Sequence, residues 1–176
     1  DVATSAQKQA VIDGGSATDI VTSANGLGDA IATILADKSL DTAFRALCLK
    51  LPDAGRLAQE IGQDVDPDQL HQICEEQMMA LAHHLEPTLL EQYEAAMPTG
   101  SYDPGAIGAG GRQLANTCLE LLVRTGKPEH AERAKQQFAT TDNMTNRLAA
   151  MSALAHHEAS DLSLAALGTF EHDYSH

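Results

Sequence analysis

The stretch from Arg112 to Leu154 constrains the fold more than any other part of this chain. It contains three successive segments with apolar residues three or four positions apart, which is the spacing of an amphipathic helix. Gly126 is placed to end the first helix and Asn143 to cap the third. No segment shows the period-two alternation typical of a half-buried strand. The pattern therefore predicts a scaffold built from helices.

The strongest start signal lies earlier in the chain, at Asp66–Gln69. This segment combines a capping carboxylate, a proline at the first helical position and a glutamine placed as a capping-box partner. It predicts a helix from Pro67 to about His84. The pair at 86–87, Glu followed by Pro, predicts the start of a separate helix that runs to Ala96.

The other helices follow from similar signals. Asp41 is placed to cap a helix over 42–51, a short helix over 53–61 ends at Gly62, and Asp161 is placed to cap the last helix. Within each helix the apolar spacing predicts an inward face. The residues predicted to point inward are Ile31, Ile34, Leu35, Phe44, Leu47, Cys48, Leu51, Leu70, Ile73, Cys74, either Gln77 or Met78, Leu81, Ile107, Leu114, Cys118, Leu121, Leu122, Leu148, Met151, Leu154, Leu164, Leu167 and Phe170.

Helices of ten to twenty residues joined by tight turns predict an all-α fold of stacked antiparallel helix pairs. No exact sequence repeat is present, so the expected architecture is a degenerate superhelix of the armadillo or HEAT kind. We expect this helical-repeat domain to span residues 28–176. The preceding residues, 1–27, show no clear pattern and are expected to be a terminal segment or a linker.

Charge and composition exclude several function classes. The formal net charge of −14 argues against a nucleic-acid partner, because phosphate binding requires clustered Lys and Arg. No segment approaches the roughly 18 to 20 apolar residues of a membrane span, and residues 1–10 do not resemble a signal peptide. Three cysteines without metal-ligand spacing suit a reducing compartment. We therefore expect a cytoplasmic protein with no membrane or nucleic-acid partner.

The acidic segment around Asp66 resembles a calcium loop in part. Asp64, Asp66, Asp68 and Glu75 fall at the first, third, fifth and twelfth positions of such a loop. The sixth position, which requires glycine for a sharp turn, is Gln69. These acids are therefore interpreted as helix-start residues, which the helix dipole favours.

The eight histidines do not form a metal-binding motif. His71 and Cys74 share one helix face, but a structural zinc site needs four ligands and a catalytic one usually three. The adjacent pairs at 83–84 and 156–157 point to different faces of a helix. The zinc-peptidase motif His-Glu-x-x-His is absent. We expect neither a metal ligand nor a bound cofactor within this chain.

The glycine-rich segment 105–111 looks superficially like a phosphate-binding loop. No strand pattern precedes it, and no Gly-Lys-Ser/Thr follows it. Close helix packing or local looseness explains the glycines better. Nucleophile motifs such as Gly-x-Ser-x-Gly are also absent, so no catalytic residue is expected, and substrate-binding residues stay undefined.

The amino-acid sequences of these helices resemble the C-terminal helical domain of the bacterial aminopeptidase N family of zinc metallopeptidases. The resemblance runs from about Gly28 to His172. It rests on the following segments: Ala36-Asp37-Lys38 with Leu49-Lys50-Leu51-Pro52, Asp66-Pro67, Leu89-Leu90-x-x-Tyr93, Arg112-x-Leu114-x-Asn116-x-Cys118-Leu119, Phe138, Asn143-Met144-Thr145, Leu148-Ala149-Ala150-x-Ser152-Ala153 and a final Phe170.

The resemblance implies a role within a longer enzyme. In that family an upstream domain carries the zinc ligands and the catalytic residues, and the helical domain closes over it and restricts entry to short peptides. None of those motifs occurs here, so no catalytic or metal residue is carried over. The resemblance also implies that further helices follow the matched region, so we expect the domain to be truncated at its C-terminal end.

The expected function is thus the wall or lid of the substrate chamber in a zinc aminopeptidase that removes N-terminal residues from peptides. The expected partners are the catalytic remainder of the polypeptide and the peptide substrates, and the fragment alone is expected to be inactive. Apolar helix faces that the longer protein covers would promote self-association. The alternatives are a self-standing helical-repeat interaction module and a small helical protein that binds a metal ion.

Overall fold

The computed structural model describes residues 26–62, 65–97, 102–156 and 160–174, with side chains left out at 160–163 and 173–174. Nearly all of the expected segment 1–27 and the acidic position 64 lie outside these residues. All regular secondary structure in the described part is helical, which confirms the predicted all-α class. The helices are α3 (Leu27–Ala36), α4 (Thr42–Cys48), α5 (Ala54–Ile61), α6 (Pro67–Ala96), α7 (Ala106–Arg124), α8 (Pro128–Thr140), α9 (Met144–Ala155) and α10 (Ser160–Tyr174).

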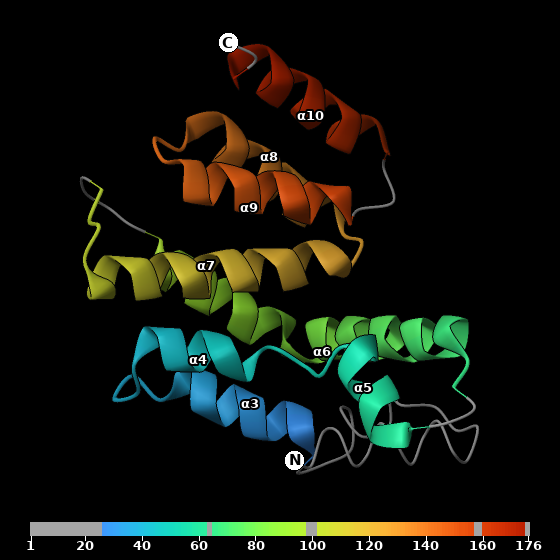
Figure 1. The fold of residues 1–176 in the computed structure, drawn as a ribbon. Helices are drawn as coiled ribbons and strands as arrows, with labels where there is room; N and C mark the ends of the chain where they lie inside the picture. Colours follow the sequence, from blue (N-terminus) through green and yellow to red (C-terminus); the bar gives the residue numbers. More distant parts are fainter. Residues whose placement is uncertain (1–25, 63–64, 98–101, 157–159, 175–176) are drawn as a thin grey trace.

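The helices stack in layers along one direction (Figure 1). The α3–α4 pair and α5 lie at one end, α6 lies between them and α7, and α7 crosses the middle of the molecule. The α8–α9 pair lies on the other side of α7, and α10 forms the far end. Helix α7 packs against α4, α6, α8 and α9, so it joins the two halves of the stack.

The predicted caps set the beginnings and ends of the helices. The Asp41 carboxylate accepts backbone hydrogen bonds at 2.9 and 3.1 Å at the start of α4, and the Asp66 carboxylate does so at 2.9 and 3.4 Å at the start of α6. Asn143 caps α9 through a bond of 2.9 Å from the backbone of Asn146. Gly62 and Gly126 follow α5 and α7 with φ of +95° and +74°, which favours glycine.

Helix α6 corrects the prediction of two separate helices. It runs unbroken through Pro87, where the sequence predicted a new start. A proline inside a helix removes one backbone hydrogen bond and costs about 3 kcal/mol. Leu81, Leu85 and Leu89 lie on one face across this position and are each no more than 1% exposed. Their burial offsets the cost, and the axis of α6 changes direction partway along (Figure 1).

Helix α4 is rotated relative to the prediction. Phe44 and Leu47 were predicted to point inward, but they are 49% and 54% exposed. The inward face instead carries Arg45 and Ala46, followed by Leu49. A seven-residue helix has few apolar contacts to fix its rotation. Here a buried arginine and its hydrogen bonds determine which side faces the core.

Some of the residues predicted to point inward on α7, α9 and α10 are exposed instead. Ile107 is 87% exposed because the first turn of α7 extends past its neighbours, and Leu148 is 41% exposed because α9 turns its alanines inward. On α10, Leu164 and Leu167 are exposed and Ala166 is buried. Helix α10 also begins at Ser160, one residue before the predicted cap Asp161. Closely packed helices favour small residues at the contact, which apolar spacing alone does not reveal.

Candidate functional site

A buried polar network joins four helices at the centre of the stack. Gln137 Nε2 donates to Asn116 Oδ1 at 2.9 Å and to the Asn146 carbonyl at 3.0 Å. Asn116 Nδ2 donates to Asn146 Oδ1 at 3.0 Å, and Tyr93 Oη donates to Gln137 Oε1 at 3.1 Å. The four side chains come from α6, α7, α8 and α9.

This network has a structural rather than a chemical character. Gln137 and Asn146 are 3% and 2% exposed, so no substrate reaches them. Burial raises the pKa of the Tyr93 hydroxyl, so this group stays neutral and acts as a hydrogen-bond donor. Satisfied buried networks fix one arrangement of the packed elements. Asn116 and the Asn143 cap, both in segments that carry the family resemblance, therefore hold α7, α8 and α9 in register.

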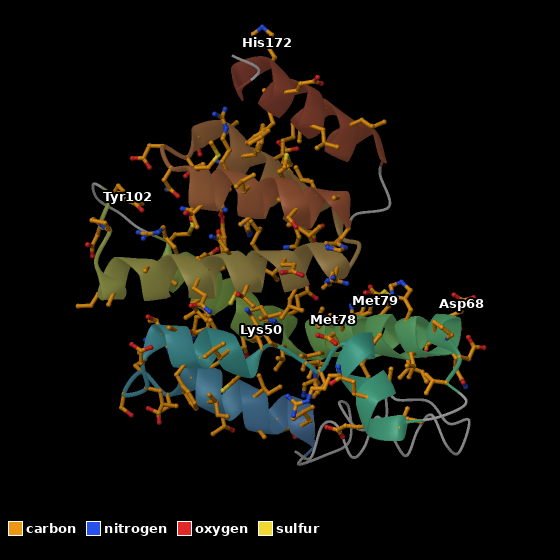
Figure 2. The ribbon with its side chains drawn as sticks, viewed as in Figure 1. Lys50, Asp68, Met78, Met79, Tyr102 and His172 are labelled. Carbon is orange, nitrogen blue, oxygen red and sulfur yellow. The ribbon has the colours of Figure 1, made fainter. Side chains whose placement is uncertain are left out.

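Arg112, another residue of the resembling segment, holds the chain that leads into α7. Its Nη1 donates to the Asp103 carbonyl at 2.5 Å, and its guanidinium lies 4.5 Å from the centre of the Tyr102 ring. Tyr102 lies at the edge of the stack (Figure 2). The Asp103 carboxylate accepts backbone hydrogen bonds from Gly105 at 2.8 Å and Gly108 at 3.1 Å. This arrangement fixes the start of α7.

The glycines of segment 105–111 allow close packing, in line with the sequence interpretation. A Cβ atom at Gly110 would lie 2.5 Å from Thr42 Oγ1 and 3.3 Å from the backbone nitrogen of Ala43. A Cβ at Gly108 would collide with Asp103. The segment forms the first turns of a helix with no preceding strand in the described part of the chain. Its glycines let α4 and the 102–105 segment approach α7.

A second polar cluster joins α6 to the start of α8. Lys127 Nζ donates to both Glu86 carboxylate oxygens at 2.7 Å, and His130 Nε2 lies 3.0 Å from Glu86 Oε1. An ionised carboxylate only accepts hydrogen bonds, so His130 Nε2 carries the proton. The hydrogen bond from Lys127, followed by that from His130, lowers the pKa of Glu86. These residues are 41 and 44 positions apart from Glu86, so no local spacing in the sequence predicted the cluster.

Glu86, Glu129 and His130 form a group of three possible metal ligands, whose donor atoms lie within 4.8 Å of one another. The Lys127 ammonium already neutralises Glu86, and a cation there would have to displace it. The donor set is thus better suited to an ion pair than to a zinc ion, which favours neutral imidazole or thiolate ligands without a competing cation. We assign no metal to this cluster.

The sequence-predicted metal and calcium candidates have other roles or positions. The Asp66 carboxylate caps α6, and Asp68 lies in the first turn of that helix (Figure 2). Cys74 Sγ faces the Pro52 carbonyl at 3.9 Å, and burial raises the pKa of its thiol. Within the described ranges, neither His71 nor Cys74 belongs to a group of three possible ligands. Among the candidates that lie in the described ranges, the structure brings no three together as possible ligands of one ion.

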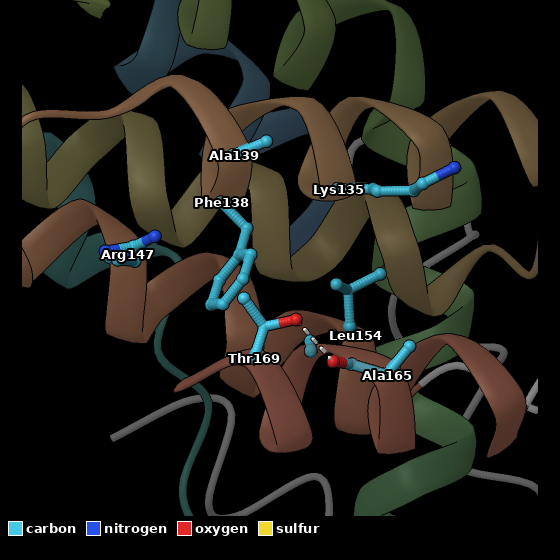
Figure 3. A pocket seen from close by; sticks show the side chains of 8 residues that line it. Lys135, Phe138, Ala139, Arg147, Leu154, Ala165 and Thr169 are labelled. Carbon is cyan, nitrogen blue, oxygen red and sulfur yellow. Dashed lines mark hydrogen bonds between the residues drawn. The ribbon is translucent and has the colours of Figure 1, made fainter. Parts of the chain in front are cut away.

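An apolar pocket of about 340 Å³ lies between α8, α9 and α10 (Figure 3). Phe138 and Leu154 form its floor, and Ala165 and Thr169 of α10 face them. Lys135 lies at the rim, and the Arg147 guanidinium sits 5.1 Å from the centre of the Phe138 ring. Sequence reasoning missed this pocket because it placed Leu164 and Leu167, rather than Ala165 and Ala166, against α9.

The buried thiol of Cys118 offers no nucleophile. Burial raises its pKa to about 12, although the nearby Arg45 guanidinium acts in the opposite direction. The thiolate, which is the reactive form, is therefore a negligible fraction at neutral pH. No helix in the described ranges is long and apolar enough to cross a membrane.

Comparisons with known proteins show which family this chain belongs to. The family described as "Domain of unknown function (DUF3458_C) ARM repeats" matches residues 2–176. Aminopeptidase N of Caulobacter vibrioides is 31% identical over 120 residues, and aminopeptidase N of Escherichia coli K12 is 32% identical over 128 residues. The alignments cover 68% and 72% of this chain. The chain spans only 14% of the length of each relative.

A solved structure shows the same fold. The crystal structure of Legionella pneumophila aminopeptidase A in complex with aspartic acid superposes with a TM-score of 0.76 at 22% identity. The match covers 96% of this chain and 20% of that chain. The ARM-repeat description and this fold confirm the predicted superhelical architecture. The chain belongs to the DUF3458_C family of ARM repeats and corresponds to part of the C-terminal helical domain of an aminopeptidase.

Proposed function

We propose that this chain forms part of the chamber wall in a zinc aminopeptidase that removes N-terminal residues from peptides. The observation that carries the proposal is the family match over residues 2–176, together with the packing and capping roles of the resembling residues. Arg112, Asn116 and Asn143 hold helices in position rather than line a catalytic centre. The chain contributes a rigid surface, and the chemistry belongs to another part of the longer protein.

The zinc ion of such an enzyme would polarise the scissile carbonyl and activate water. The residues of this chain do not fit it. The sequence lacks His-Glu-x-x-His, and the cluster around Glu86 is neutralised by Lys127. We therefore place the metal in the catalytic remainder of a cytoplasmic polypeptide. The cysteines at 48, 74 and 118 form no disulfide in the structure, in keeping with a reducing compartment.

The outer face of α10 is the part of this surface that the longer protein is expected to cover. Leu164 and Leu167 are 64% and 48% exposed, and they lie three residues apart on one helix face. Helix α10 packs on α9 and α8 within the described residues, and its other side has no neighbour there. Further helices of the domain would bury these leucines, as the layers of a solenoid do.

Activity assays on two proteins test the proposal. The 176-residue chain, supplied with zinc, should not cleave an alanyl chromogenic substrate, and chelator-sensitive cleavage by the chain alone would contradict the account. The full-length product of the gene should cleave the same substrate and lose this activity to a chelator. A full-length product without chelator-sensitive aminopeptidase activity would overturn the proposal.

A second assay tests the wall itself. In the full-length protein, removal of the segment that matches residues 28–174 should raise kcat/KM for a peptide of about twenty residues relative to a tetrapeptide. An unchanged ratio in a folded, active deletion variant would argue against a role in restricting entry. It would favour a self-standing interaction module instead.

A further inference from the structure

Arg45 occupies a position where a helical scaffold normally has an apolar residue. It is 7% exposed, whereas its neighbours on α4, Phe44 and Leu47, point outward. Its Nη1 donates to the Leu35 carbonyl at 3.0 Å and to Gln92 Oε1 at 2.8 Å. The apolar pattern of α4 is inverted so that this guanidinium can lie between α3, α4 and α6. Such a violation of local patterning commonly marks a functional position.

Arg45 forms no ion pair within 4 Å in the described part of the chain, and its charge acts on the Asp37 carboxylate only from a greater distance. Arg124, which is similarly buried, pairs with Glu75 at 2.6 Å and with Glu120 at 3.4 Å. Arg45 instead contacts two neutral oxygens, and the C-terminal end of α3 supplies only a partial negative charge. Both of its hydrogen bonds use Nη1, and its Nε is buried without a hydrogen-bond partner in the described ranges. A buried cation without an anion is costly.

A cavity of about 320 Å³ opens beside this guanidinium, at the low end of the size range for small-molecule sites. Its polar lining residues are Arg45, Gln92, Thr42 and the exposed Lys38. The apolar lining consists of Ala95, Ala96 and Leu114. The cavity thus combines two cationic groups with a small methyl-lined surface.

The acidic groups near this cavity are already bound by other groups. The Asp37 carboxylate accepts hydrogen bonds from the Ser39 hydroxyl at 2.6 Å and the Ser39 backbone at 2.9 Å. The Asp41 carboxylate caps α4 through Ala43 and Phe44. Neither forms an ion pair with Arg45 within 4 Å among the described residues. The Ser39 hydrogen bonds, and to a smaller extent the charge of Arg45, lower the pKa of Asp37. Because neither carboxylate contacts the guanidinium, its free edge is open to an anion from outside the chain.

We propose that this cavity binds a small organic carboxylate, with the carboxylate on Arg45 and Lys38 and a short apolar group against Ala95, Ala96 and Leu114. A guanidinium binds a planar carboxylate with good geometry, and such charge-assisted hydrogen bonds are stronger than neutral ones. The same chemistry is offered by a free small carboxylate and by the C-terminal carboxylate of a peptide. This inference goes beyond the proposed chamber wall and does not depend on it.

Titration of the 176-residue chain tests the inference, with amide chemical shifts as the readout. Isobutyrate should bind saturably, with shifts centred on residues of α4 and the end of α6. Isobutyramide, which has the same shape without the charge, should bind at least tenfold more weakly. An N-acetylated tripeptide that binds with a free but not with an amidated C-terminus would identify the C-terminal carboxylate of a peptide as the source. Binding of N-acetylalanine without binding of the tripeptide would identify a free small carboxylate. Equal binding of isobutyrate and isobutyramide would overturn the inference.

Three variants locate the site. Arg45→Met should weaken isobutyrate binding at least tenfold, and Ala95→Phe should do so by filling the cavity while leaving the guanidinium in place. Arg56→Met is the matched control, because the Arg56 side chain is 56% exposed and pairs with Glu60 on α5, away from the cavity lining. If Arg45→Met does not fold, Ala95→Phe decides. Unchanged affinity in a folded Ala95→Phe variant would contradict the assignment.

Discussion

Helices α7 and α10 show how unevenly a stack of helices supports its layers. Helix α7 has neighbours on both sides, and its buried residues include Leu114, Leu119 and Leu122. Within the described residues, helix α10 packs mainly on α9 and α8, and Ala166 is its one buried hydrophobic residue among 164–172. In repeat proteins, stability is approximately the sum of such interfaces between neighbours. A leucine in α7 therefore contributes much more to the free energy of unfolding than a leucine in α10.

A leucine truncation in each helix tests this difference most strongly. Leu122 is fully buried, so Leu122→Ala should lower the free energy of unfolding by about 3 to 4 kcal/mol. Leu164 is 64% exposed, so Leu164→Ala should change it by less than about 0.5 kcal/mol. Urea unfolding followed by circular dichroism measures both. Equal losses would mean that α10 is part of the core.

The central polar network predicts the next largest effect. Gln137→Met removes the partner of Asn116, Asn146 and Tyr93 while keeping a side chain of similar size. Because these groups stay buried, the variant should lose about 2 to 3 kcal/mol of unfolding free energy. The adjacent and exposed Gln136 provides the control, since Gln136→Met should have little effect. Similar unfolding curves for the two variants would show that the network does not join the layers.

Substitution of one glycine in each of these two helices should change the stability in opposite directions. A methyl group at Gly110 would lie 2.5 Å from Thr42 Oγ1, so Gly110→Ala should destabilise the chain by about 1 to 2 kcal/mol. Nothing lies within 4 Å of the corresponding position at Gly168, so Gly168→Ala should stabilise α10 by up to about 1 kcal/mol through helix propensity. Thermal unfolding measures both changes. A loss of stability in Gly168→Ala would indicate a contact on the open side of α10.

The smallest predicted effect is a pH dependence between α6 and α8. Lys127 and His130 hold the pKa of Glu86 below its usual value of about 4.3. The ion pair therefore stabilises the fold above that pH, and this stabilisation is lost as the pH falls through the lowered pKa. The melting temperature of wild type should exceed that of Glu86→Gln at pH 6, and the gap should narrow by pH 3. Glu132→Gln, at an exposed pair with Lys135, should show little gap at either pH.

The sequence predicted helix starts and ends better than helix faces. The caps at Asp41, Asp66 and Asn143 were right because a capping side chain acts on backbone groups two or three residues away. Pro87 was misread because its cost is offset by packing between distant helices. The predicted faces of α4 and α10 were wrong because short alanine-rich helices leave the choice of face to their neighbours.

The sites depended even more on distant contacts. The side-chain hydrogen bonds of the Glu86 cluster and of the Gln137 network each join residues more than twenty positions from one another in the sequence. The bond from Gln137 to the Asn146 backbone is the one exception. Arg45 gave the one local signal, a charged residue between two apolar positions of a short helix. The sequence analysis made no prediction for it, and arginine is rarely buried without a partner. Its burial became visible only once Leu35 and Gln92 were placed beside it.

Hydrogen exchange of the 176-residue chain, read by mass spectrometry, tests the central claim most directly. The account predicts that amides of α7 exchange only through near-global unfolding, those of α8 and α9 at intermediate free energies, and those of α10 through local opening at the lowest free energy. Protection of α10 equal to that of α7 would contradict a stack that is anchored at its centre and open at α10.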